Sequence, residues 1–336
     1  MSTNGAKGNH LIEVRDLVKH FPLTKGILFR KQVGAVQAVD GVSFDVVEGE
    51  TLGLVGESGC GKSTTARLLT RLLEPTSGNI NYKGQDIAHL SRNDLKPLRR
   101  DMQMIFQDPY SSLNPRKTVG SIIGEPFVIH EVESDAGKRK KRVQELMDIV
   151  GLNPEHYNRF PHEFSGGQRQ RIGVARAIAL KPKLIVADEP VSALDVSIQA
   201  QILNLLQDLR QRLGLTMLFV SHDLRIIEHV SDRVAVMYLG RIVESGPREK
   251  IYTGARHPYT RALLAAVPLP DPRHRPERTE RRAMLMGDLP SPIDPPSGCA
   301  FHPRCPYAED VCRRVVPPLA GRGAHAVACH VFPAED

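Results

Sequence analysis

The chain has 336 residues, enough for one large domain and a smaller one with buried cores. Hydrophobic residues make up 41% and charged residues 25%, which is ordinary for a globular protein, and the net charge is only +7. Such a mild basic charge suits a membrane surface or a phosphate ligand, and alone it does not indicate a nucleic-acid-binding protein. No apolar run approaches the roughly 18 residues of a membrane-spanning helix, and residues 1–10 lack an apolar signal core, so we expect a cytosolic protein.

The first elements in chain order have the patterns of strands. Residues 11–18 and 35–47 are partly apolar and strand-like, and residues 22–34 between them are predicted to form a loop. A short buried strand over 51–55 runs into a glycine-rich turn and then into a helix over 64–73. A strand, a glycine-rich turn and a helix in this order form the first unit of an α/β nucleotide-binding fold.

The middle of the chain changes character before the strands return. We predict a mostly helical insertion over about 93–164, in which residues 138–150 have apolar side chains at helical spacing. Strand patterns follow at 184–187 and 217–220, with an amphipathic helix over 198–213 between them. Alternating strands and helices predict a parallel sheet covered on both faces.

The composition shifts again after about residue 251. Residues 251–336 contain 14 of the 25 prolines, 11 arginines and no lysine. Because proline disrupts helix interiors and central strands, this segment is predicted to be a separate, loop-rich extension that needs some other stabiliser.

A phosphate-binding motif follows the strand over 51–55. The pattern G-x-x-x-x-G-K-S, followed by one further hydroxyl residue, comprises Gly56, Glu57, Ser58, Gly59, Cys60, Gly61, Lys62, Ser63 and Thr64. Its glycines let backbone N–H groups converge on a phosphate chain at a helix N-terminus. We expect Lys62 to reach the β- and γ-phosphates and Ser63 to ligate Mg²⁺, while Cys60 occupies a free position of the motif. A chance match in a glycine-rich turn is the alternative, which the placement between strand and helix disfavours.

Two adjacent carboxylates end the apolar strand over 184–187. We expect Asp188 to hold Mg²⁺, directly or through water, and Glu189 to activate the attacking water as a general base. Taken alone, the same pattern could be a strand that ends in a charged loop. The phosphate motif earlier in the chain favours the catalytic interpretation.

A third motif lies at the predicted start of another helix and consists of Ser165, Gly166, Gly167 and Gln168. It offers a second anion-binding helix end, which one phosphate loop does not obviously require. Here the sequence resembles the ATP-binding subunits of ABC transporters, and this element resembles their signature motif. The resemblance implies that two ATPase domains pair head to tail. Each signature then closes on the ATP held by the other domain's phosphate loop.

The other motifs of that family are present in order. Gln107 matches the Q-loop and is implied to act in catalysis and at Mg²⁺, Asp195 matches the D-loop, and His222 matches the switch histidine that contacts the γ-phosphate. Phe21 stands where the family has an aromatic residue that stacks on adenine, although core packing explains it equally well. A lone histidine after a strand is usually structural, and only its place after the other motifs gives His222 a role.

The resemblance covers residues 11–250 and reaches into detail. The segments 107–120, 160–162 and 257–260 resemble the dipeptide/oligopeptide branch of ABC importers. The implied fold class is α/β: a RecA-like P-loop ABC ATPase core over 11–250, with its helical subdomain at about 93–164, and a small Cys-rich C-terminal extension over 251–336.

Four of the five cysteines lie in that extension, namely Cys299, Cys305, Cys312 and Cys329. Disulfides are not expected in a reducing compartment. Four thiolates can bind Zn²⁺ or an iron–sulfur cluster, and there is no C-x₂₋₄-C knuckle of the usual zinc kind. The extension resembles that of peptide-importer ATPases, in which such cysteines hold a [4Fe–4S] cluster. The alternatives are Zn²⁺, with His302, His325 or His330 replacing one ligand, and four free buried thiols.

The resemblance implies an ATPase that powers import of dipeptides or oligopeptides, bound peripherally at the cytoplasmic face of the cell membrane. The expected partners are a second ABC ATPase subunit, either a homologous chain or a second copy of this one, and two membrane permease subunits, with an extracytoplasmic peptide-binding protein acting indirectly. Other solutes in this branch, such as nickel or glutathione, remain open.

Two other classes of protein fit the sequence less well. A soluble ABC ATPase that acts on ribosomes would carry two cassettes, and one that acts on DNA would carry a long coiled coil between Lys62 and Ser165; the sequence has neither feature. A scaffold without hydrolysis is disfavoured because every catalytic motif is present.

Overall fold

A computed structural model describes residues 10–25, 31–108, 110, 112–266, 289–321 and 325–334. The chain divides into two units. The first comprises residues 1–46, 51–89 and 221–336, and the second comprises residues 47–50 and 90–220. Pro109 and Ser111, inside the predicted Q-loop segment, lie outside the described residues.

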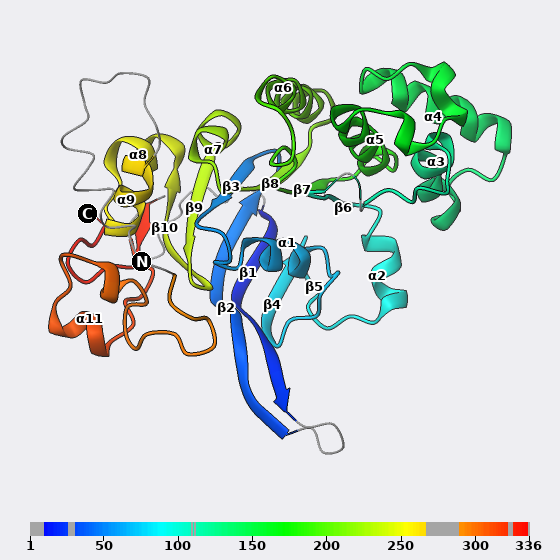
Figure 1. Ribbon diagram of the computed structural model, residues 1–336. Helices are drawn as coiled ribbons and strands as arrows, with labels where there is room; N and C mark the ends of the chain where they lie inside the picture. The colour runs from blue at the N-terminus through cyan, green and yellow to red at the C-terminus, as the bar shows by residue number, and fades with distance from the viewer. Residues whose placement is uncertain are drawn as a thin grey trace, which may run out of the picture. The chain divides into compact units, whose positions relative to one another are not determined.

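The first unit begins with a sheet in the order β2-β1-β4-β5. Its strands are β1 (His10–Lys25), β2 (Lys31–Val47), β4 (Ser77–Tyr82) and β5 (Gln85–Asp86). β1 pairs antiparallel with β4, with Ile12 opposite Tyr82, and Figure 1 shows β1 and β2 as a long blue pair. The predicted loop over 22–34 is therefore wrong at both of its ends, where the strands continue. Backbone hydrogen bonding between strands extends β1 and β2 into residues whose side chains show no clear apolar alternation.

Four more strands of the first unit follow the order β11-β10-β9-β3. They are β3 (Thr51–Val55), β9 (Arg233–Tyr238), β10 (Arg241–Pro247) and β11 (Ala326–Val327). β3 runs parallel to β9, whereas β10 pairs antiparallel with both β9 and β11. Every residue of β3 is buried, as expected for a strand covered on both faces. The C-terminal region thus adds a short strand to the sheet that contains β3.

The helices of the first unit are α1 (Lys62–Leu69), α7 (Leu224–Val230), α8 (Arg248–Gly254), α9 (Pro258–Ala266), η4 (His302–Arg304) and α11 (Asp310–Arg314). The helix predicted over 64–73 begins two residues earlier and ends four residues earlier. It ends because Arg71 has a φ of 51°, a left-handed conformation that a helix cannot continue.

The second unit contains the parallel strands β6 (Met102–Ile105), β7 (Leu184–Asp188) and β8 (Thr216–Ser221). β7 pairs with β6 and with β8, and every residue of β7 and β8 is buried, which confirms the predicted parallel arrangement here. The strand β6 falls inside the range predicted to be mostly helical.

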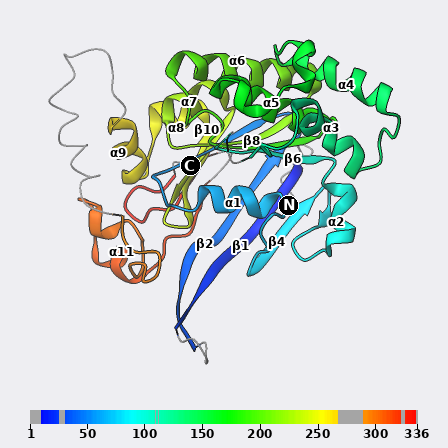
Figure 2. The same ribbon diagram turned by 45° about the vertical axis from the view of Figure 1, so that its right-hand side comes forward.

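The helices of the second unit are α2 (Arg92–Leu98), α3 (Val119–Ile129), α4 (Ala136–Ile149), η1 (Pro154–Asn158), η2 (Pro161–Glu163), α5 (Gly166–Ile178) and α6 (Val196–Leu213). Helices α3, α4 and α5 form one group, drawn in green in Figures 1 and 2. Val143 and Met147, spaced four residues apart, are the side chains that α4 buries. This matches the apolar spacing on which the helix was predicted.

Candidate functional site

The phosphate loop joins β3 to α1 in the first unit, and its glycines are required sterically. A Cβ on Gly56 would lie 2.1 Å from the carbonyl oxygen of Met237, and one on Gly61 would lie 2.1 Å from that of Ala38. Gly61 also has a φ of 108°, which residues with a side chain rarely adopt. The loop is therefore packed between two neighbouring backbone segments of the same unit.

Lys62 is buried at the start of α1 and is held by the loop itself. Its Nζ donates hydrogen bonds to the carbonyl oxygens of Gly56, at 2.8 Å, and Glu57, at 2.9 Å. Cys60, within the loop, is buried, and this burial raises the pKa of its thiol. Ser63 and Thr64 are half-buried in the first turn of α1.

Two other predicted residues lie in the first unit. His222 is exposed and follows the last residue of β8. Phe21 is half-buried in β1, where the ammonium group of Lys19 lies 5.1 Å from the centre of its ring. The Phe21 ring is thus neither a core residue nor fully exposed.

The second unit brings together two of the predicted catalytic residues. The Nε2 of Gln107 donates to Oε2 of Glu189 over 3.2 Å, and Asp188 is buried at the end of β7. The backbone of Glu189 has a φ of 47° and its N–H donates to the carbonyl oxygen of Val220 at 3.0 Å. A strained conformation held by its neighbours is frequent at functional positions.

The predicted signature motif caps helix α5. Oγ of Ser165 accepts from the N–H of Gln168 at 3.3 Å, and Oε1 of Gln168 accepts from the N–H of Ser165 at 3.0 Å. A Cβ on Gly167 would lie 2.4 Å from Ile198 of α6, so glycine permits a close approach of the two helices. Gly166 follows Ser165 at the first position of α5, and Asp195 is the N-cap residue of α6.

Two side chains that the sequence analysis did not select bind the phosphate loop. The hydroxyl of Tyr259, in α9, accepts from the N–H of Glu57 at 2.9 Å. The guanidinium of Arg304, in η4, donates to both carboxylate oxygens of Glu57 at 2.8 and 3.0 Å. Tyr259 lies in the segment 257–260 that resembles peptide importers, whereas no sequence pattern singles out Arg304.

The four cysteines of the extension are free thiols that lie within electrostatic reach of one another. Burial is the main reason that the pKa of Cys299 is raised to about 11, and the nearby Cys312, Cys329 and Cys305 contribute to this increase. In the part of the chain that the structure describes, no group of three or more His, Cys, Asp or Glu side chains is arranged to hold a metal ion. The predicted metal-binding role of the cysteines, with either iron or zinc, is therefore not supported here.

The three histidines considered as replacement ligands have other hydrogen-bond partners. A ring nitrogen of His302 lies 3.0 Å from the carbonyl oxygen of Cys299, and one of His330 lies 3.0 Å from that of Val315. Nε2 of His325 lies 2.9 Å from Oε1 of the fully buried Glu244. These contacts disfavour the hypothesis that a histidine replaces one cysteine.

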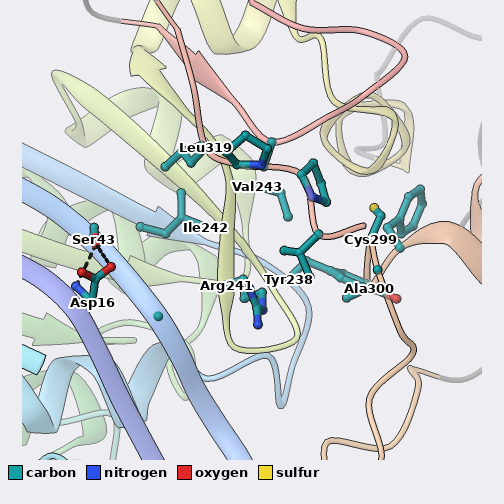
Figure 3. Close-up of a pocket in the computed structure, with 16 residues that line it drawn as sticks. Asp16, Ser43, Tyr238, Arg241, Ile242, Val243, Cys299, Ala300 and Leu319 are labelled. Carbon is teal, nitrogen blue, oxygen red and sulfur yellow. Dashed lines mark hydrogen bonds between the residues drawn. The ribbon is translucent and has the colours of Figure 1, made fainter. Parts of the chain in front are cut away.

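A cavity of about 340 Å³ lies within the first unit, lined by Cys299 and not by residues of the phosphate loop. Figure 3 shows Asp16 and Ser43 on one side, hydrogen-bonded to each other, and Tyr238, Cys299 and Leu319 on the other. The residues predicted to bind nucleotide are not among those that line it.

Comparisons with known proteins establish the family. Residues 39–192 match the family model described as ABC transporter, and residues 243–312 match the model described as Oligopeptide/dipeptide transporter, C-terminal region. A probable peptide ABC transporter ATP-binding protein of Sinorhizobium fredii is 57% identical over 322 residues, 96% of this chain and 90% of the relative. This chain belongs to the ATP-binding subunits of oligopeptide/dipeptide-type ABC transporters. The resemblance stated from the sequence is thereby confirmed, and the chain is an ABC ATPase.

Other relatives agree with this membership. An oligopeptide transport ATP-binding protein of Bacillus subtilis is 53% identical over 324 residues, covering 96% of this chain and 97% of the relative. A dimeric ATP-binding cassette, solved in a post-hydrolysis state with ADP and Pi, has a TM-score of 0.63 and 27% identity. The match covers 70% of this chain and 98% of that one. The predicted P-loop ABC ATPase fold is therefore confirmed. Among the described residues of this ABC ATPase, no helix is long and apolar enough to span a membrane.

Proposed function

We propose that this ABC ATPase powers the import of dipeptides or oligopeptides through a membrane transporter. The match of residues 243–312 to the peptide-transporter C-terminal region carries this proposal, because this region lies outside residues 39–192, which match the general ABC transporter model. We further propose that the ATPase domain spans residues 11–250, with its helical subdomain at about 93–164, and that the C-terminal extension spans 251–336.

The phosphate loop is proposed to bind the triphosphate of ATP. Its glycines leave room for backbone N–H groups to approach phosphate oxygens, and Lys62 would exchange its two loop carbonyl partners for the β- and γ-phosphates. Phe21 is proposed to stack on the adenine. Its side chain is only half-buried, so part of it is accessible to a ligand.

Hydrolysis is proposed to depend on Glu189 as general base, with His222 contacting the γ-phosphate. Ser63, Gln107 and Asp188 offer oxygen ligands of the kind that Mg²⁺ prefers, and bound Mg²⁺ neutralises charge on the β- and γ-phosphate oxygens. The hydrogen bond from Gln107 to Glu189 supports these roles, since it fixes the carboxylate that must accept a proton from water.

A second ABC ATPase subunit, homologous to this chain, is proposed to complete each site. The Ser165–Gln168 cap presents a helix N-terminus suited to a phosphate held by the partner, with Asp195 near the same interface. The relative solved as a dimer supports this pairing. Two membrane permease subunits and an extracytoplasmic peptide-binding protein would complete the transporter, which places this chain at the cytoplasmic face of the membrane as a peripheral subunit.

The extension is proposed to hold a [4Fe–4S] cluster through Cys299, Cys305, Cys312 and Cys329, in a structural role. The resemblance of the extension to that of peptide-importer ATPases supports this proposal, whereas the described thiols are not arranged to hold a metal ion.

Reconstitution tests the proposed function directly. The chain is co-expressed with the permease and ATPase subunits of its transporter, and the purified complex is placed in proteoliposomes with the binding protein. We expect ATP hydrolysis that a dipeptide or oligopeptide stimulates, together with uptake of that peptide. Stimulation by nickel or glutathione and not by peptides would contradict the proposed substrate class, although not the ATPase activity.

A further inference from the structure

The C-terminal extension binds the phosphate loop at a single loop residue, Glu57. The Tyr259 hydroxyl accepts a hydrogen bond from the backbone N–H of Glu57. Arg304 forms a bidentate ion pair with the Glu57 carboxylate. The side chain of Arg304 is only 7% exposed, and that of Glu57 is 25% exposed. A two-pronged, largely buried pair of this kind is specific in geometry and stronger than a surface ion pair.

A buried aromatic cluster fixes the two residues that reach the loop. The rings of Tyr238, Tyr259 and Phe301 are almost fully buried, and their centroids lie 4.6 to 5.4 Å apart. Phe301 precedes Arg304 by three residues, and an Arg304 nitrogen lies 3.5 Å from the Tyr238 hydroxyl. Contacts other than the ion pair with Glu57 therefore also hold the Arg304 side chain in position.

The charge of Glu57 gives this contact a consequence for nucleotide binding. Glu57 is the second residue of a loop whose ligand is polyanionic, and an unpaired carboxylate there would repel phosphate. The Arg304 guanidinium neutralises the negative charge of the Glu57 carboxylate. The hydrogen bond to Tyr259 fixes the Glu57 backbone. Together they keep the loop in one shape while Lys62 remains the cation that faces the phosphates.

We propose that Arg304 and Tyr259 are positioning residues for ATP, through which the C-terminal extension neutralises Glu57 and fixes the phosphate loop. This inference rests on the proposed assignment of residues 56–63 as the triphosphate site. It gives the extension a direct part in nucleotide affinity, separate from any cluster that its cysteines hold.

The test compares the affinity for ATP with the maximal rate of hydrolysis in full-length protein. Arg304→Met should raise the Kd and the KM for ATP about tenfold, since it leaves a partly buried carboxylate without its partner. The kcat at saturating ATP should change less than about threefold, because nothing at the reacting atoms is lost. The double variant Arg304→Met/Glu57→Gln should recover most of the lost affinity. Arg313→Met removes an exposed arginine of α11 in the same extension and should behave as wild type.

Arg304→Lys, which keeps the charge and loses the fork, should bind ATP with intermediate affinity. If Arg304→Met does not fold, this variant and the double variant still decide between charge and structure. An unchanged Kd in Arg304→Met, or a double variant that binds ATP no better than the single variant, would overturn the inference.

The Lys62→Ala variant distinguishes a failure of this inference from a failure of the proposed triphosphate site. Loss of ATP affinity in Lys62→Ala but not in Arg304→Met would contradict only the role of the extension. Unchanged affinity in Lys62→Ala would contradict the assignment of the loop itself.

Discussion

The amide of Gln107 donates a hydrogen bond to the carboxylate of Glu189 across 3.2 Å, although the two residues are 82 positions apart. Two neighbouring parallel strands create this contact. Ile105 is the last residue of β6 and pairs in register with Ala187 of β7, so the segments that follow both strands leave the sheet at the same edge. The carboxyl ends of parallel strands are where α/β proteins place their ligands.

Glu189→Gln is expected to bind ATP and to hydrolyse it roughly 10²–10⁴-fold more slowly than wild type, because the change keeps the size of the side chain and removes the general base. ATP binding and steady-state hydrolysis, measured on the same preparation, check this. A dimer with ATP trapped in it should accumulate. Turnover close to that of wild type would refute the role given to Glu189.

Ser165→Arg is expected to leave ATP binding to the phosphate loop of the same chain intact. A bulky cation at the α5 cap should instead block the site completed by the partner subunit, so turnover there should be abolished. Mixed dimers with one mutated chain measure this, with nucleotide binding followed at each loop. Loss of binding in the mutated chain's own loop would contradict the composite site.

The cysteines make a prediction about metal content. Protein purified without oxygen should contain about four irons per chain and be brown, and replacing any one of the four cysteines of the extension with serine should remove the colour. Nucleotide binding should survive in these variants. One zinc and no iron would favour the zinc hypothesis, and a metal-free protein with an ordered extension would contradict both.

The lowered pKa of buried His257 leads us to expect that the folding stability of the protein decreases at acidic pH. Burial, with Arg261 as a second cause, lowers the pKa of His257 to about 3, well below the ordinary value of about 6.5. Between these two pKa values, His257 is therefore protonated in the unfolded chain but not in the folded chain. The contribution of His257 is constant above about pH 6.5, and folding stability falls as the pH drops from there toward 3.

The matched variant is His257→Asn, whose amide oxygen can accept the hydrogen bond that the N–H of Tyr259 donates to Nδ1 of His257. The free energy of unfolding of wild type, relative to this variant, should fall by about 1 kcal/mol per pH unit below about pH 5.5. Urea titrations from pH 8 to pH 4 measure it. Parallel curves for the two proteins over this range would show that the pKa of His257 is the same in the folded and the unfolded protein, and would contradict the prediction.

The amino-acid sequence by itself determined the local elements of the nucleotide site. The G-x-x-x-x-G-K-S pattern, the paired carboxylates Asp188 and Glu189, and the Ser165–Gln168 cap all depend on backbone rules that act within a few residues. An apolar run, a glycine that must adopt positive φ and a helix cap each determine the backbone conformation of the few residues around them. The family could be predicted for the same reason, since its motifs are short and occur in a fixed order.

Only the tertiary structure decided which distant segments meet these elements. Arg304 and Tyr259 reach Glu57 across 247 and 202 positions of sequence, and neither contact has a local signal. The strands β1 and β2 extend through residues predicted as loop because backbone pairing with a neighbouring strand, and not side-chain pattern, sustains them. The free energy of such contacts depends on the path of the whole chain, so the residues near them in sequence do not reveal the partner.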